Sequence, residues 1–135
     1  MSGMTPEQMA AFLERPLVAV FVTLRANGAP HAIPVWYEYR NGAFIVFTSS
    51  TFQRVKNLER DSRAAITIST HDEPYMYVSA EGPVSITSEG VEETGLSIAR
   101  RYMGENAQQF LDDVHDEHSV LLRLTPERIL TWVED

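Results

Sequence analysis

The segment Phe47–Asp61, FTSSTFQRVKNLERD, joins the end of an apolar strand to a helix, and the other predicted elements can be placed around it. Four consecutive hydroxyl residues, Thr48–Thr51, follow the strand. The helix after them carries Arg54, Lys56 and Asn57 in its first turns. Free N–H groups and the positive end of the helix dipole attract anions to a helix N-terminus. The segment therefore indicates a phosphate site, although an ordinary capped helix with solvated charges fits the same residues.

Helical spacing separates the two cations of this segment. At about 100° per residue, Phe52, Val55 and Leu58 form the buried stripe of the helix. Arg54 and Lys56 then lie about 160° apart, one on each flank, so they need not contact one phosphate. Arg54 is closer to the helix start, and we expect it to anchor the anion. Lys56 then faces a second anionic group or solvent.

Three predicted strands precede the helix, at Leu17–Leu24, His31–Tyr39 and Ala43–Phe47. The pairs Asn27-Gly28 and Asn41-Gly42 separate them, and Asn-Gly is typical of two-residue hairpin turns. Leu17–Leu24 is β-branched or aromatic at alternate positions on both faces, which predicts burial on both sides. We therefore expect these strands to form an antiparallel meander.

The remaining elements extend this sheet and cover it. Beyond the helix, the pattern predicts Arg63–Thr70, Tyr75–Thr87, Ser119–Leu124 and Arg128–Val133 as strands, and Glu92–Met103 and Glu105–Val114 as helical segments. Gly82-Pro83 inside a strand indicates a bulge or bend of the kind that closes a barrel. A short helix after Thr5 begins the chain. Six or seven strands with short covering helices predict the α+β class, mainly β, as a small antiparallel barrel.

Composition limits the class of protein. A chain of 135 residues is long enough for one domain, residues 1–135, with a substantial core. The net charge of −8 argues against general binding to nucleic acid or anionic membranes. The chain has no cysteine, which excludes disulfides, thiolate metal sites and thiol nucleophiles. No apolar run approaches the roughly 20 residues of a membrane span, so we expect a soluble cytoplasmic protein.

The sequence offers little direct catalytic chemistry. His115-Asp116-Glu117-His118 places two histidines and two carboxylates together, but it is strongly polar and follows a helix end, which favours a solvated loop over a metal site. No Ser-His-Asp set or nucleophile elbow is recognisable, and we assign no catalytic residue and no metal. Hydride transfer can still be performed by a cofactor that the protein holds and orients.

Aromatic and apolar residues lie near the phosphate candidate. In the predicted meander, Val35 and Trp36 come beside Phe47 and Thr48. Pro34 cannot donate to a ladder, so its strand has an open side or a bulge there. A flat heteroaromatic ring on this strand would place its phosphate at the next helix start. Simple core packing of Trp36 accounts for the same pattern.

The chain resembles, in the order of five segments, the split β-barrel family of flavin- and deazaflavin-dependent oxidoreductases related to pyridoxamine 5′-phosphate oxidase. These segments are HAIPVWYEY, FIVFTSS, QRVKNLERDSRAAITI, PYMYVSAEGPVSI and LTPERILTW. The resemblance covers nearly the whole chain and is greatest to the short branch that uses the deazaflavin coenzyme F420. It implies a split barrel that binds F420 or FMN and forms a homodimer with two cofactor sites at the subunit interface.

The resemblance also implies site residues. Arg54, Lys56 and Asn57 would hold the cofactor phosphate, and the ring would be lined by Pro34, Val35, Trp36, Thr48 and Ser49. The implied function is hydride transfer between F420 and a small organic substrate. An FMN-binding oxidoreductase and a non-catalytic cofactor-binding protein are the alternatives. The family commonly has Arg-Lys-x-Arg-Asn-Leu where this chain has Gln53–Leu58, and arginine and lysine differ at a phosphate, so the choice of cofactor stays open.

Overall fold

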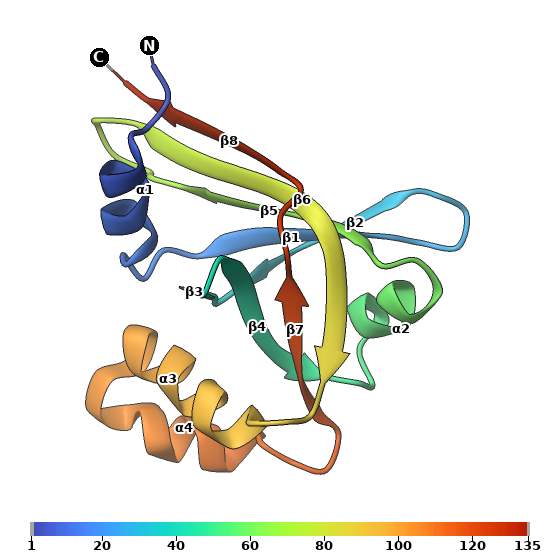
Figure 1. Cartoon of the computed structure of the whole chain (residues 1–135). Coiled ribbons are helices and arrows are strands. Elements are labelled where there is room, and N and C mark those ends of the chain that lie inside the picture. The colour runs from blue at the N-terminus through green and yellow to red at the C-terminus, as the bar shows by residue number, and fades with distance from the viewer. Residues whose placement is uncertain (1, 135) are drawn as a thin grey trace.

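The computed structural model describes residues 2–134 and contains eight strands, four α-helices and one 3₁₀ turn within them (Figure 1). The elements are α1 (Pro6–Leu13), β1 (Ala19–Leu24), β2 (Pro30–Val35), β3 (Glu38–Arg40), β4 (Ala43–Ser49), α2 (Gln53–Arg60), β5 (Arg63–Ser69), β6 (Met76–Thr87), α3 (Val91–Met103), η1 (Gly104–Asn106), α4 (Ala107–Val114), β7 (Ser119–Leu124) and β8 (Arg128–Val133). The chain is thus mainly β with short helices, as the sequence predicts.

The strands form one antiparallel sheet in the order β2-β1-β5-β6-β7-β4-β3, and β8 pairs with β6. The long strand β6 curves through the molecule (Figure 1), pairing with β5 and β8 in its first part and with β7 from Val84 onward. The change occurs at Gly82-Pro83, which confirms the predicted bend. A Cβ atom on Gly82 would lie 2.1 Å from the carbonyl oxygen of Thr125, so only glycine fits there.

The predicted three-stranded meander is wrong at its second strand. The segment His31–Tyr39 is divided into β2, which pairs with β1, and β3, which pairs with β4. Tyr37, between them, is fully buried, and its hydroxyl donates to the carbonyl oxygens of Leu13 and Arg15. The chain therefore passes from one end of the sheet to the other here. This raises the number of strands from the predicted six or seven to eight.

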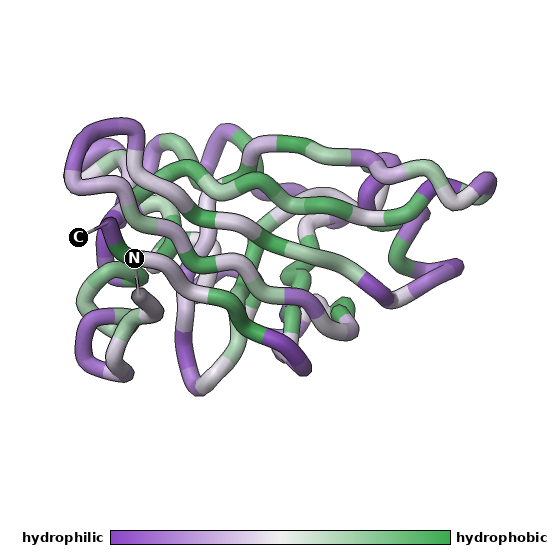
Figure 2. The backbone as a smooth tube through the Cα atoms, turned by 90° about the horizontal axis from the view of Figure 1, so that it is seen from above, coloured by the Kyte–Doolittle hydropathy of each residue, from purple (hydrophilic) through white to green (hydrophobic). Residues whose placement is uncertain are grey.

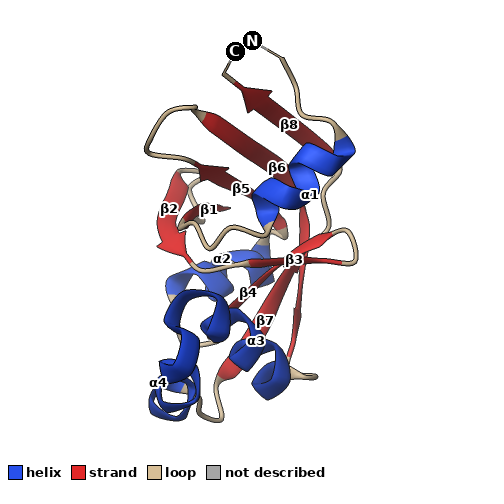
Figure 3. Ribbon diagram, turned by 90° about the vertical axis from the view of Figure 1, so that its left-hand side faces the viewer, coloured by secondary structure: helices blue, strands red, loops and turns tan. Residues whose placement is uncertain are grey.

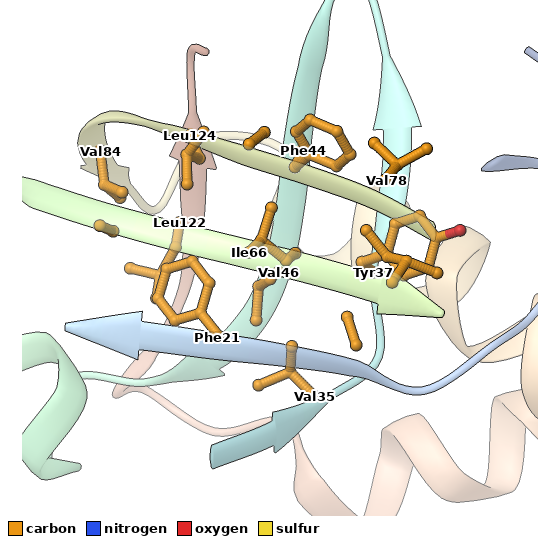
Figure 4. Close-up of a cluster of buried hydrophobic side chains, with 14 of the residues drawn as sticks. Phe21, Val35, Tyr37, Phe44, Val46, Ile66, Val78, Val84, Leu122 and Leu124 are labelled. Carbon is orange, nitrogen blue, oxygen red and sulfur yellow. The ribbon is translucent and has the colours of Figure 1, made fainter. Parts of the chain in front are cut away.

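The main hydrophobic core, called here the barrel core, lies inside the curved sheet and is drawn in Figure 4. Five strands contribute most of its large side chains: Phe21 of β1, Phe44 and Val46 of β4, Ile66 of β5, Val78 of β6, and Leu122 and Leu124 of β7. Phe12 of α1 and Tyr37, between β2 and β3, are also among its largest. Hydrophobic and hydrophilic residues alternate along the strands, and the loops at their ends are mostly hydrophilic (Figure 2). The expected burial of the first strand on both faces is wrong, because Val20 is 44% exposed beside buried Phe21.

Helices α3 and α4 lie together at one end of the barrel, beside β4 and β7 (Figures 1 and 3). We call this pair the cover. A second, smaller cluster joins the cover to the barrel through Ile45, Ile98 and Leu121. The predicted end of the first covering helix is confirmed, since Gly104 is its C-cap with φ 56°. None of the helices formed by residues 2–134 is long and apolar enough to cross a membrane.

Candidate functional site

A cavity of about 520 Å³ lies between the barrel and the cover. It is located where β2 and β4 face each other without being hydrogen-bonded neighbours. Strand β3 pairs with only the first three residues of β4, so the part of β4 from Val46 to Ser49 has a ladder partner only on its β7 side. The cavity therefore lies at a gap in the sheet. This gap exists because the segment predicted as the second strand is divided into β2 and β3.

Six of the eight predicted site residues line this cavity: Pro34, Val35, Trp36, Thr48, Ser49 and Arg54. They come from the end of β2, the end of β4 and the start of α2. The sequence predicts that these residues are adjacent because their strands pair in a meander, but β2 and β4 do not pair. The structure brings them together across the gap in the barrel.

Residues of the cover form the opposite wall, and sequence reasoning missed them. Gly95 and Ala99 of α3 and Phe110 of α4 line the cavity. A Cβ atom on Gly95 would lie 2.7 Å from the ring of Phe47, so glycine allows α3 to approach β4 closely. Glycine is unfavourable inside a helix. Gly95 within the predicted helix Glu92–Met103 was therefore the available signal of a close contact.

Trp36 is held by aromatic residues of the cover. Its ring stacks on Tyr102 with centroids 4.7 Å apart and an interplanar angle of 3°, and Phe110 lies at 5.0 Å. The Tyr102 hydroxyl donates to the carbonyl oxygen of Leu17 and accepts from the backbone N–H of Tyr37. Burial raises the pKa of Tyr102 above its usual value, which keeps the hydroxyl protonated for this donation. The orientation of Trp36 is thus defined before any ligand binds.

Arg54 is the one charged residue among the described residues that line the cavity. Its Nη1 donates to Thr48 Oγ1 at 2.5 Å, and its guanidinium lies 4.9 Å from the centre of the Phe52 ring. Its Nε is buried without a hydrogen-bond partner, and no carboxylate within residues 2–134 forms an ion pair with it. Burial lowers the pKa of Arg54 from its usual value. Partial burial of a cation without a counter-ion has an unfavourable desolvation free energy, and an anionic ligand would offset it.

The start of α2 adds to this anion end of the cavity. Its N-cap residue, Phe52, forms no side-chain capping bond and is 49% exposed, so the prediction that it belongs to the buried stripe of the helix is wrong. The Ser49 and Thr51 hydroxyls instead bond to each other at 2.8 Å, and Thr48 accepts from Arg54. The capped-helix interpretation therefore does not hold, and the helix start remains available to an anion.

Two predicted site residues lie outside the cavity lining. Lys56 is exposed on the flank of α2, as its helical spacing predicts. Asn57 is fully buried beneath the helix, where its Nδ2 donates to Thr23 Oγ1 at 2.9 Å. The roles of these two residues at a cofactor stay predictions.

The polar segment 115–118, considered as a metal site from its sequence, is not part of the cavity lining. His115 Nε2 lies 3.7 Å from Glu92 Oε1, and His118 Nε2 lies 3.5 Å from Glu117 Oε1. Within the described chain, no three side chains of the metal-binding types gather at one point. The segment connects α4 to β7, and the Ser50 N–H donates to the carbonyl oxygen of His118.

The fold and the cavity together define a split β-barrel of the kind found in flavin-binding oxidoreductases. The family model described as pyridoxamine 5′-phosphate oxidase matches residues 5–133, and this chain belongs to that family. None of the curated proteins compared with it matches.

Solved structures show the same fold. The conserved hypothetical protein Rv2991 from Mycobacterium tuberculosis is 25% identical with a TM-score of 0.85, over 96% of this chain and 85% of that one. A structure described as an F420 reductase is 21% identical with a TM-score of 0.76, over 93% and 98% of the two chains. An FAD-binding protein from Mesorhizobium loti is 13% identical with a TM-score of 0.71, over 99% and 98%.

Proposed function

We propose that this protein binds the deazaflavin coenzyme F420 in the cavity beneath the cover and transfers a hydride between it and a small organic substrate. The observation that carries the proposal is Arg54, a half-buried cation without a carboxylate partner among the described residues, in a cavity otherwise lined by uncharged side chains. Such a cavity fits a ligand with a flat apolar body and one anionic end.

The two ends of the cavity have different tasks. Arg54, Thr48 and the uncapped start of α2 would bind the phosphate through charge-assisted hydrogen bonds. Pro34, Val35 and Trp36 would orient the ring, and the cover would exclude water from its opposite face. When bound, F420 supplies the hydride donor or acceptor. No histidine or carboxylate lies among the described residues of the lining, so the chain mainly binds and orients.

FMN is the second candidate cofactor, because it presents the same combination of a phosphate and a flat ring. The structural similarity to an FAD-binding protein supports it, while the similarity to an F420 reductase supports the first candidate. A non-catalytic binding protein would use the same cavity without turnover. Titration with F420 and FMN side by side separates the cofactors. Reduction of acceptors by the reduced F420 complex then separates an enzyme from a binding protein.

The decisive variant is Arg54→Ala. We expect it to weaken binding of the preferred cofactor by about 10- to 150-fold, equivalent to about 1.5–3 kcal/mol, because a charge-assisted phosphate contact is lost. Quenching of Trp36 fluorescence in a Trp132→Phe background reports binding, since the chain has only these two tryptophans. Arg25→Ala removes an exposed charge outside the lining and is the matched control. Equal affinity of folded Arg54→Ala and wild-type protein would refute the proposal.

We also propose that a second copy of the chain completes the site. Three large apolar residues around the cavity are exposed, Val18 by 51%, Phe52 by 49% and Val114 by 42%. Val20 continues this apolar surface from Val18 along β1. Exposed apolar surface next to a ligand cavity is typical of an interface. Sedimentation velocity should give a dimer at micromolar concentration, and Val20→Asp should dissociate it. A wild-type monomer would contradict this arrangement.

A further inference from the structure

Helix α2 has few local features that would hold it in one position. It has eight residues, which is marginal for an isolated helix, and its N-cap residue forms no side-chain bond. Val55 and Leu58 pack into the barrel core. Apolar packing is non-directional and tolerates small shifts of a helix along its axis. Directional contacts define its position more narrowly, and Arg60, at the last residue of α2, makes one by donating to the carbonyl oxygen of Leu24. A second such contact lies closer to Arg54.

Asn57 provides such a contact. It is fully buried at 0% exposure, and its Nδ2 donates to Thr23 Oγ1 at 2.9 Å. Its Oδ1 accepts from Gln53 Nε2 at 2.8 Å, and His31 Nδ1 lies 3.4 Å from its Nδ2. A buried amide is costly unless it is hydrogen-bonded, so a shift of α2 that broke these bonds would be penalised.

The partners of Asn57 connect it to the other wall of the cavity. Thr23 of β1 pairs directly with His31 of β2. Strand β2 continues from His31 to Pro34 and Val35, which line the cavity. Asn57 therefore ties the helix that carries Arg54 to the strand pair that carries the ring-facing wall.

Arg54 lies three residues before Asn57, less than one turn away on the same helix. We infer that Asn57 is a positioning residue, which contacts no ligand and holds α2 against Thr23 so that Arg54 stands at the anion end of the cavity. Its effect on ligand binding rests on the proposed role of Arg54. A residue that contacts the phosphate directly, as the family resemblance implies for Asn57, would have to reach the cavity, and Asn57 is not part of its lining.

The test uses Thr23→Val, which removes the acceptor of Asn57 while keeping the shape of the side chain and leaving the cavity lining unchanged. We expect Thr23→Val and Asn57→Ala each to weaken F420 or FMN binding by about 3- to 10-fold. In an Arg54→Ala background, neither should weaken binding further, because both act through Arg54. Ile68→Val, a barrel-core change on β5 and outside the cavity lining, controls for general destabilisation and should leave affinity unchanged.

Several results would overturn the inference. If Asn57→Ala weakens binding but Thr23→Val does not, Asn57 contacts the ligand itself. If the losses multiply with that of Arg54→Ala, the two residues act independently. If both variants lower the melting temperature but bind as the wild type does, Asn57 is only structural.

A second readout needs no ligand. The ¹⁵Nε–¹H resonance of Arg54, assigned by its loss in Arg54→Ala, reports the surroundings of a buried N–H group. Thr23→Val should shift or broaden it, whereas Ile68→Val should not. An unchanged resonance in Thr23→Val refutes the positioning role. If Arg54→Ala leaves cofactor binding intact, the proposed function fails, and this resonance still decides whether Asn57 positions Arg54.

Discussion

The barrel core and the cover are built in different ways. The barrel core gathers eighteen buried residues, mostly from the strands. The cover rests on the barrel through a cluster of three buried residues, Ile45, Ile98 and Leu121, with four partly buried ones around it. Directional polar contacts supplement this small cluster. The Arg101 guanidinium of α3 donates to the carbonyl oxygens of Tyr37, Leu13, Glu14 and Arg15.

This difference shows why the cavity lies between the two regions. A well-packed interior leaves few voids, whereas a cover joined by a small cluster and polar contacts can leave space beside its attachment. Ligand sites use such junctions because the firm region positions side chains and the other region encloses the ligand. Four substitutions or conditions test this comparison.

The largest expected effect is in the barrel core. Phe21→Ala should lower the free energy of unfolding by about 3–5 kcal/mol, because Phe21 is buried among strands that cannot collapse into the space. Urea denaturation followed by circular dichroism measures the change. Leu130→Ala, a change at a 54% exposed apolar position of β8, is the control and should cost far less. A loss below 1 kcal/mol for Phe21→Ala would show that the barrel core is not the firmer region.

Arg101→Met should lower the free energy of unfolding by about 1.5–3 kcal/mol. The apolar part of the side chain is retained, but the carbonyl oxygens at the end of α1 lose a charged donor. Trp36 fluorescence should change as well, since Tyr102, which stacks on it, adjoins Arg101. Arg100→Met changes the exposed neighbouring arginine and should be nearly silent. An equal effect of the two variants would mean that Arg101 does not anchor the cover.

Gly95→Ala tests the close approach of the cover to β4. Alanine is favoured over glycine in helices by about 1 kcal/mol, yet here its Cβ would lie 2.7 Å from the Phe47 ring. We expect a net loss of about 1–2 kcal/mol and weaker cofactor binding, because the helix must move. Glu93→Ala, at an exposed position of the same helix, should not destabilise. If Gly95→Ala were more stable than the wild type, α3 could move away from Phe47 without a loss of free energy, and the close approach would not matter for stability.

The smallest effect appears only at high pH. Burial raises the pKa of Tyr37 from 10.0 to about 12, and the Arg101 guanidinium beside it opposes this only in part. A raised pKa in the folded state means that stability is fully present below pH 10 and is lost as the pH rises toward 12. Urea midpoints at pH 8, 10 and 11 should fall in that order. Tyr37→Phe should flatten the decline, and an unchanged slope would contradict this assignment.

Local sequence features predicted most elements and several of their ends. Asn41 and Gly42 both have positive φ, as their hairpin turn requires, and the helix predicted after Thr5 begins with a capping box formed by Thr5 and Gln8. The division at Trp36–Tyr37 was not predictable, because HAIPVWYEY is a continuous strand-like run. The strand pairings, with Tyr37 buried against the end of α1 between β2 and β3, show that the chain changes its place in the sheet.

The candidate site was predicted in part. Residues on the strand ends and the helix start were identified because hydroxyl and cationic side chains are visible in a sequence, whereas the cover residues Gly95, Ala99 and Phe110 have no distinguishing chemistry. Asn57 was predicted to contact a phosphate and lies buried against Thr23. Helical spacing gives the angle of each side chain around the helix axis. It does not show that the side carrying Asn57 faces Thr23 of β1.

The amino-acid sequence is enough to identify a small, mainly β barrel of one recognisable family and to locate the anion-binding candidate at Phe47–Asp61. These follow from local periodicity, turn chemistry and the order of segments, which are properties of the chain. The folded arrangement is what shows that the site lies at a gap between β2 and β4 and that α3 and α4 enclose it. It also left Arg54 without a carboxylate partner among the described residues. Such facts depend on contacts between residues far apart in the chain, and no local pattern encodes them.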